Sequence, residues 1–107
     1  MGLSTHILDL ATGMPAKGVK VSLSIDGEPA GESVTNDDGR CTDLLGGRPL
    51  KAGVYRLVFH AGDYLGRSDE PPFFDVIPID FTVTDTERHY HVPLLLSPFG
   101  YSTYRGS

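Results

Sequence analysis

The sequence predicts an all-β domain, a two-sheet antiparallel sandwich of about eight short strands with one short helix. The first observation is that 13 glycines and 8 prolines occur in 107 residues, which indicates many turns. The second is that apolar and polar residues alternate in short runs at regular spacing, whereas long helical periodicity is absent. A chain of this length has room for one hydrophobic core, so residues 1–107 are expected to form a single domain.

Alternating runs and turn signals place the elements along the chain. The cleanest run is 19–25, in which Val19, Val21, Leu23 and Ile25 alternate with polar residues, as in a strand with one buried face. Asp26-Gly27 and Asn36-Asp37-Asp38-Gly39 are typical of turns, because these residue types tolerate positive φ. Further strands are expected at 3–10, 30–35, 40–45, 54–60, 76–84, 88–96 and 100–105, with loops at 11–18 and 46–53.

Three local features refine this arrangement. The segment 30–35 is more polar than the other strands, which favours a place near the edge of a sheet. Pro78 has no amide proton, so the strand at 76–84 should also lie at an edge or carry a bulge there. The only helix candidate is one or two turns around 63–68, which Pro71 and Pro72 would end.

Charge and cysteine content exclude several classes of function. The net charge is −5, which argues against nucleic acid or an anionic membrane as a partner, because both require basic patches. Cys41 is the single cysteine and can form no internal disulfide, so the fold needs no oxidising compartment. We find no signal peptide at the N-terminus and no apolar window long enough to span a membrane. These features predict a soluble cytoplasmic protein.

Three histidines are the first candidates for chemistry. His6 lies alone on a predicted strand, where a half-exposed histidine with a hydrogen-bond partner is the simpler interpretation and a general base the sharper one. His89 and His91 are two residues apart, so both point to one face of their strand, opposite a core face formed by Tyr90, Val92 and Leu94. A metal site would need a third ligand, which His6 could supply, but no cysteine partner or Glu-x-x-His helix supports such a site.

Two arginines are candidates for binding an anion or polarising a carbonyl. Arg40 directly follows the Asp-Gly turn, and Arg48 lies in a loop beside two glycines and a proline. A guanidinium suits either task, but residue chemistry alone does not choose between the two. The sequence contains no Gly-x-Ser-x-Gly elbow, phosphate-binding loop or dinucleotide motif.

Three separated blocks resemble a known family. The segment 89–107, which closes on the motif Tyr104-Arg105-Gly106-Ser107, resembles the C-terminal block of the 5-hydroxyisourate hydrolases, the transthyretin-related enzymes of purine catabolism. The residues 4–9 with 12–16 are similar to the N-terminal block of that family, and 35–40 to its central block. The resemblance covers nearly the whole chain. Asp75 departs from it, because the family commonly has a proline there.

The resemblance implies a fold, an assembly and an activity. The fold would be a transthyretin-like sandwich, assembled as a homotetramer, a dimer of dimers, with sites in clefts where subunits meet. The activity would be hydrolytic opening of the lactam ring of 5-hydroxyisourate to 2-oxo-4-hydroxy-4-carboxy-5-ureidoimidazoline in urate degradation, with no metal or other cofactor. The residues that match the family pattern are the catalytic His6, Arg40, His91 and Ser107 and the substrate-binding Tyr104, Arg105 and Gly106.

Two questions stay open at this level. A transthyretin-like binding protein without catalysis is the main alternative, although a binding pocket alone would not require two histidines, an arginine and the closing motif together. The sequence also does not say which of His6 and His91 would act as the general base.

Overall fold

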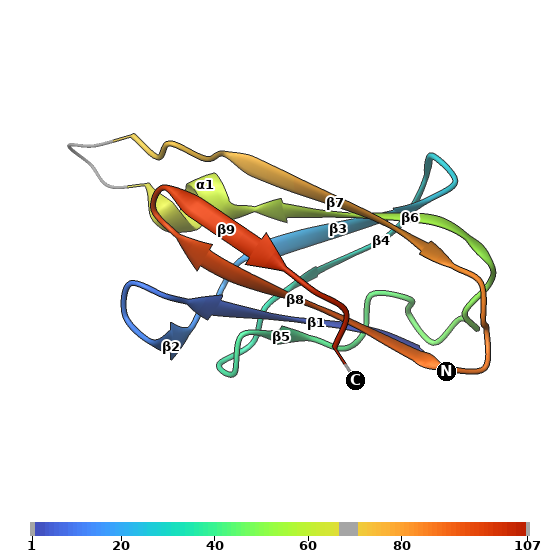
Figure 1. Cartoon of the computed structure of the whole chain (residues 1–107). Helices are drawn as coiled ribbons and strands as arrows, with labels where there is room; N and C mark the ends of the chain where they lie inside the picture. Colours follow the sequence, from blue (N-terminus) through green and yellow to red (C-terminus); the bar gives the residue numbers. More distant parts are fainter. Residues whose placement is uncertain (1, 67–70, 107) are drawn as a thin grey trace.

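The computed structural model of the chain describes residues 2–66 and 71–106. Within these residues there are nine strands and one short helix, arranged as two stacked sheets (Figure 1). The elements are β1 (Gly2–Asp9), β2 (Met14–Pro15), β3 (Lys20–Ile25), β4 (Glu28–Val34), β5 (Arg40–Cys41), β6 (Gly53–His60), α1 (Ala61–Leu65), β7 (Val76–Val83), β8 (His89–Ser97) and β9 (Gly100–Thr103).

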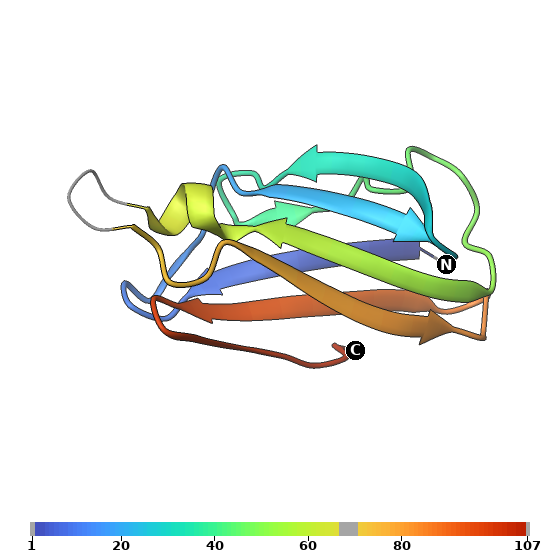
Figure 2. The same cartoon turned by 90° about the horizontal axis from the view of Figure 1, so that it is seen from above.

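Neither sheet comes from one continuous half of the chain, because each contains strands from both halves. One sheet has the order β2-β1-β8-β9, and β5 pairs with β1 beside β2. The other has the order β4-β3-β6-β7. The two layers lie face to face when the molecule is viewed from above (Figure 2). The all-β two-sheet sandwich expected from the sequence is therefore confirmed.

One pairing departs from the antiparallel prediction. Strands β1 and β8 run parallel over eight residue pairs, from Gly2 beside His89 to Asp9 beside Leu96. Every other strand pair in the described residues is antiparallel. Antiparallel neighbours are usually joined by a short hairpin, but β1 and β8 lie at opposite ends of the chain and no hairpin constrains their direction.

Element boundaries also differ in places. The loop expected at 11–18 contains the two-residue strand β2, which pairs with the end of β1. The strand expected at 40–45 is only Arg40–Cys41, and the chain then turns, burying Leu44 and Leu45. The helix expected around 63–68 begins earlier, at Ala61, and ends at Leu65. Part of that expected helix, 67–70, lies outside the described residues.

The predicted sheet edges are confirmed. Strand β4 pairs only with β3, and β7 only with β6, so both lie at edges of the second sheet. Pro78 is therefore on a strand that has one free side, where a missing amide proton breaks no inner ladder. Among the described residues, no helix has the length and apolar character needed to cross a membrane.

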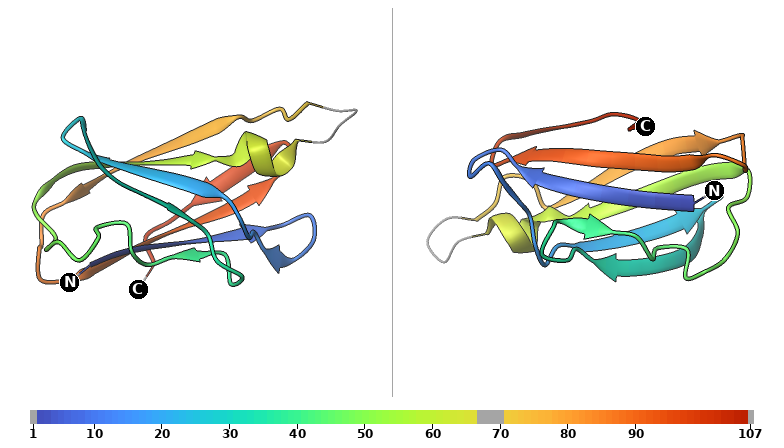
Figure 3. Two further views of the ribbon diagram at one scale, coloured as in Figure 1. Left: turned by 180° about the vertical axis from the view of Figure 1, so that it is seen from behind. Right: turned by 90° about the horizontal axis from the view of Figure 1, so that it is seen from below.

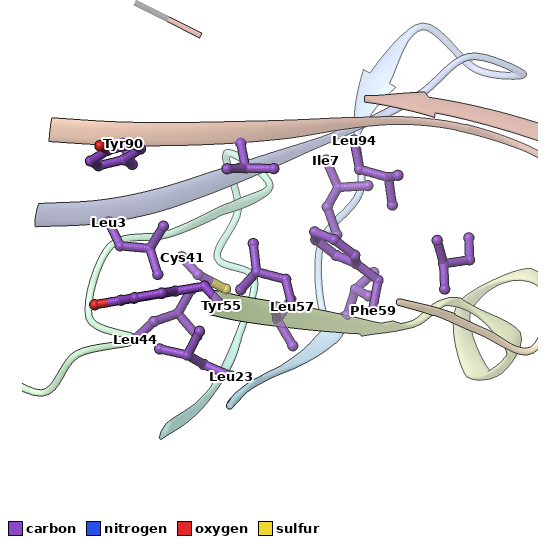
Figure 4. Packing of buried hydrophobic residues seen from close by; sticks show 14 of the residues in the cluster. Leu3, Ile7, Leu23, Cys41, Leu44, Tyr55, Leu57, Phe59, Tyr90 and Leu94 are labelled. Carbon is purple, nitrogen blue, oxygen red and sulfur yellow. The ribbon is translucent and has the colours of Figure 1, made fainter. Parts of the chain in front are cut away.

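A single core fills the space between the sheets. Leu3, Ile7 and Leu94 point from the first sheet toward Leu57 and Phe59 of the second, as Figure 4 shows. All five are at most 3% exposed. Fully burying a side chain of this size contributes roughly 1.5–3 kcal/mol, so this layer holds the two sheets together. Because these residues point inward from β1 and β8, their neighbours in sequence point outward.

Candidate active site

The pairing of β1 with β8 and β5 brings the sequence-predicted residues to one outer face of the first sheet. His6 pairs with Arg40 across β1 and β5, and Ser4 pairs with His91 across β1 and β8. Tyr90, on the other side of β8, is buried in the core as expected. His6 and His91 are half-buried, and Arg40 is exposed. The period-two geometry of strands therefore places two imidazoles and a guanidinium on the same surface.

The loop before Arg40 is fixed by its own polar residues. The Asn36 side-chain oxygen accepts hydrogen bonds from the backbone N–H groups of Asp38 and Arg40, each at 3.0 Å. Gly39 has a φ of +73°, and a Cβ there would lie 2.6 Å from the Ile7 carbonyl oxygen. Only glycine suits both the backbone conformation and this close approach. The turn thus directs Arg40 back onto β1, opposite His6.

A serine links the two histidines of β8. The Ser4 hydroxyl oxygen lies 2.8 Å from Nε2 of His89 and 2.8 Å from Nδ1 of His91. Ser4 is only 9% exposed, so its hydroxyl depends on these partners rather than on water. The sequence-based reasoning missed Ser4. A signal was available, because residues two apart on a strand, such as Ser4 and His6, lie on the same face.

Electrostatics favour neutral imidazoles on this face. Burial is the largest cause that lowers the pKa of His6, and the Arg40 guanidinium lowers it further, while hydrogen bonding to Asp38 and its charge raise it. Burial also leads the causes that lower the pKa of His91, followed by the charges of Arg40, His6 and His89, against a hydrogen bond to the Ser4 backbone that raises it. The pKa of both histidines is therefore lowered from the ordinary histidine value, which favours the neutral imidazole.

The C-terminal tail lies across His91. The backbone N–H of Gly106 donates to the His91 carbonyl at 2.7 Å, forming a bridge outside the regular strands. A Cβ on Gly106 would lie 2.6 Å from Cδ2 of His91, so the glycine backbone rests directly on the imidazole. Figure 3 shows the end of the chain returning alongside β8. Ser107, predicted as catalytic, lies outside the described residues.

The first two residues of the closing motif, Tyr104 and Arg105, line a different part of the surface. Tyr104 and Arg105 are exposed, and both line a cavity of about 320 Å³ beside β7 and β8, together with Arg88 and Tyr90. Within a single chain this cavity is separate from the set formed by His6, Arg40 and His91. The substrate-binding role predicted for Tyr104, Arg105 and Gly106 therefore stays a prediction.

The sequence raised Arg48 as an alternative to Arg40, and a metal site as an alternative role for the histidines. Arg48 donates to the backbone carbonyls of Leu45 and Ala30, so it fastens its own loop to β4. It is not on the surface that carries Arg40. For a metal, no group of three or more potential ligands is found in the residues described, and Ser4 already occupies one nitrogen each of His89 and His91.

The fold and this set of residues define a class of transthyretin-like proteins with a histidine–arginine face. The family model "HIUase/Transthyretin family" matches residues 3–106. The chain therefore belongs to this family.

Named relatives and structures agree with that assignment. A protein of Deinococcus radiodurans named 5-hydroxyisourate hydrolase is 51% identical, over 99% of this chain and 96% of the relative. The structure of Klebsiella pneumoniae 5-hydroxyisourate hydrolase is 46% identical with a TM-score of 0.88, and the match covers 100% of both chains. Sea bream transthyretin in complex with thyroxine is 31% identical with a TM-score of 0.89, over 99% of this chain and 95% of that one.

The effect of Arg40 on the pKa of His6 and His91 can be tested by mutation. Replacing Arg40 with alanine removes a positive charge that lowers the pKa of both His6 and His91, so both pKa values should rise. NMR titration of the histidine ring resonances measures this. Arg56→Ala is the matched control, because it removes the same charge from an exposed ion pair with Asp80 on the other sheet. Unchanged pKa values in Arg40→Ala would show that the guanidinium does not act on the imidazoles.

Proposed function

We propose that the protein is a 5-hydroxyisourate hydrolase, an enzyme that opens the lactam ring of 5-hydroxyisourate to give 2-oxo-4-hydroxy-4-carboxy-5-ureidoimidazoline in urate degradation. The observation that carries the proposal is the meeting of His6, Arg40 and His91 on one face of the sheet. Curated relatives with this activity in their names align over almost the whole chain. The cyclic amide is thus the substrate class that fits both the residues and the family.

The proposed chemistry uses the protonation states described above. A neutral imidazole removes a proton from water as the water oxygen attacks the ring carbonyl. The Arg40 guanidinium stabilises the oxyanion that develops on the carbonyl oxygen. When the carbon–nitrogen bond breaks, an imidazolium returns a proton to the leaving nitrogen, so protons balance over the cycle. His6 and His91 fill these two roles, and the reaction requires no metal or organic cofactor.

The C-terminal tail, residues 104–107, would complete the substrate site beside His6, Arg40 and His91. The glycine contact with His91 supports a place for the closing motif beside the reacting groups. In the proposal, Arg105 and Ser107 close around the carbonyl and nitrogen edge of the heterocycle, and Tyr104 and Gly106 shape the cavity wall. Arg105 is exposed, so its guanidinium is free to turn toward a bound ligand.

A carrier function is the second candidate. It is favoured by the close fold match to transthyretin bound to thyroxine. Carriage requires shape and a few polar groups, and it gives no reason for two neutral imidazoles beside a guanidinium. The residues on the face therefore support hydrolysis over simple binding. Since Cys41 is free and buried, the fold relies on no disulfide, and we place the enzyme in the cytoplasm.

We further propose that the enzyme is a homotetramer, a dimer of dimers, whose subunits enclose the face. In one chain Arg40 is exposed, whereas a reacting group needs shelter from water. Large apolar side chains such as Phe73 and Phe99 are 70% and 75% exposed, as is typical of contact surfaces. Sedimentation equilibrium at micromolar concentration should give four times the 11.6 kDa of the chain. A monomer with full activity would contradict shared sites.

The activity is tested by the decay of the substrate. Freshly made 5-hydroxyisourate, generated from urate by urate oxidase, is followed by ultraviolet absorbance with and without the protein. We expect micromolar protein to accelerate the decay. Arg40→Ala and His91→Ala should each lower kcat by about 10²–10⁴-fold, because each removes a group that acts in the transition state. His60→Ala is the matched control, since His60 bonds Ser22 on the other sheet.

The same assay tests the tail. Removing residues 104–107 takes away the groups proposed to enclose the substrate, and Gly106→Ala forces the backbone away from His91. Both changes should cut turnover by at least about tenfold while circular dichroism shows a folded protein. A truncated protein that keeps the full rate would reduce the tail to a packing element, and unaccelerated decay by the unaltered protein would remove the hydrolase proposal itself.

A further inference from the structure

Three side chains form a row on the outer face of the first sheet: His89, Ser4 and His91. The Ser4 oxygen lies 2.8 Å from one ring nitrogen of each histidine. A serine hydroxyl has one proton, so it can donate to only one of these two nitrogens. The other nitrogen must then carry a proton and donate to the serine oxygen. The direction of one hydrogen bond in the row thus fixes the direction of the other.

We propose that Ser4 and His89 are positioning residues that keep the proton of His91 on Nδ1 and leave its Nε2 free to act as the base. In this arrangement His91 Nδ1–H donates to the Ser4 oxygen, and the Ser4 hydroxyl donates to Nε2 of His89. The inference rests on the proposed hydrolase function and deepens it, because it assigns the water-activating role to His91 rather than to His6.

The proposed role of His91 sets this direction, because a base needs a bare Nε2 and a neutral ring then carries its proton on Nδ1. A hydrogen bond to the Ser4 backbone raises the pKa of His91, which is the effect of an acceptor on a protonated ring nitrogen. The 2.8 Å contact joins Nδ1 to the Ser4 hydroxyl oxygen, so a proton held on Nδ1 has that oxygen as its acceptor. Gly106 rests against Cδ2 of the same ring, so the imidazole is held on two sides. The charged or titratable groups that act on His91 in the described residues are Arg40, His6 and His89.

The position of His89 allows it to serve as the acceptor. Its ring lies over Gly2, where a Cβ would come within 3.2 Å of Nδ1. The glycine therefore leaves room for the ring to turn its Nε2 toward Ser4. His89 is exposed, so its Nδ1–H can bond to water while Nε2 accepts from the serine. If His89 instead donated to Ser4, the serine proton would point to His91, and Nε2 of His91 would hold the proton and could not act as a base.

The tautomer can be measured without any substrate. Nitrogen-15 NMR of the imidazole rings at a pH where His91 is neutral should show a protonated Nδ1 and a bare Nε2 in the unaltered protein. Ser4→Ala should abolish this preference. Ser22→Ala is the matched control, because it removes the 3.1 Å serine–histidine bond to His60 on the other sheet and should leave His91 unchanged. A proton on Nε2 in the unaltered protein, or the same tautomer in Ser4→Ala, would overturn the proposal.

Kinetics give a second test. Ser4→Ala should lower kcat by at least about tenfold, less than the loss of the base itself, with KM unchanged because Ser4 does not touch the substrate. At position 89, glutamine keeps an acceptor for the serine proton, whereas lysine can only donate. We therefore expect kcat of His89→Lys at least about tenfold below that of His89→Gln. Equal kcat values for the two variants, or a full rate for Ser4→Ala, would contradict the assignment.

The two tests separate this inference from the function on which it rests. If the protein fails to accelerate the decay of 5-hydroxyisourate, the hydrolase proposal falls, and the NMR measurement still decides whether Ser4 and His89 set the tautomer. If the decay is accelerated but the ring nitrogens show no preference that depends on Ser4, the positioning role alone is wrong.

Discussion

The parallel pairing of β1 with β8 is the contact on which the rest of the structure depends. It joins the two ends of the chain and aligns Ser4 with His91. Buried Thr5 strengthens the same pair by donating to the Val92 carbonyl at 2.5 Å. Because side chains alternate along a strand, a slip of one residue would turn the core side chains outward and the site side chains inward. The buried layer of the sandwich thus fixes the position of the histidines.

The outer face of the first sheet combines two imidazoles with a guanidinium. Burial and the charge of Arg40 both lower the pKa of His6 and His91, and so favour the neutral form of each imidazole. That is the state a proton acceptor requires, and the nearby positive charge is what a developing oxyanion requires. Backbone devices hold the parts in place: the turn at Gly39 directs Arg40 toward β1, and Gly106 lies against His91.

Much of this arrangement could be predicted from the sequence, and the reasons are local. The alternation in 19–25 and around His91 depends only on which side of a strand is buried, and both predictions agree with the structure. The family resemblance then selected Arg40 over Arg48, and the structure places Arg40 beside His6.

The remaining features depend on contacts between distant segments, which no local pattern encodes. The parallel direction of β8 relative to β1 was not predicted, because it involves strands from opposite ends of the chain. The short β2 was missed since its two residues form a strand only by pairing with the end of β1. Ser4 was passed over for a related reason: its role arises from two histidines that lie some 85 positions later.

The central claim is that Arg40 and His91 act as one unit on one reacting group. The measurement that tests it most directly is a double-mutant cycle in kcat/KM with Arg40→Ala, His91→Ala and the combined variant. If the two residues act together, the combined variant should lose little more than the worse single variant, a coupling of at least about 1 kcal/mol. Losses that simply multiply would show that the two residues act independently, and would contradict the account.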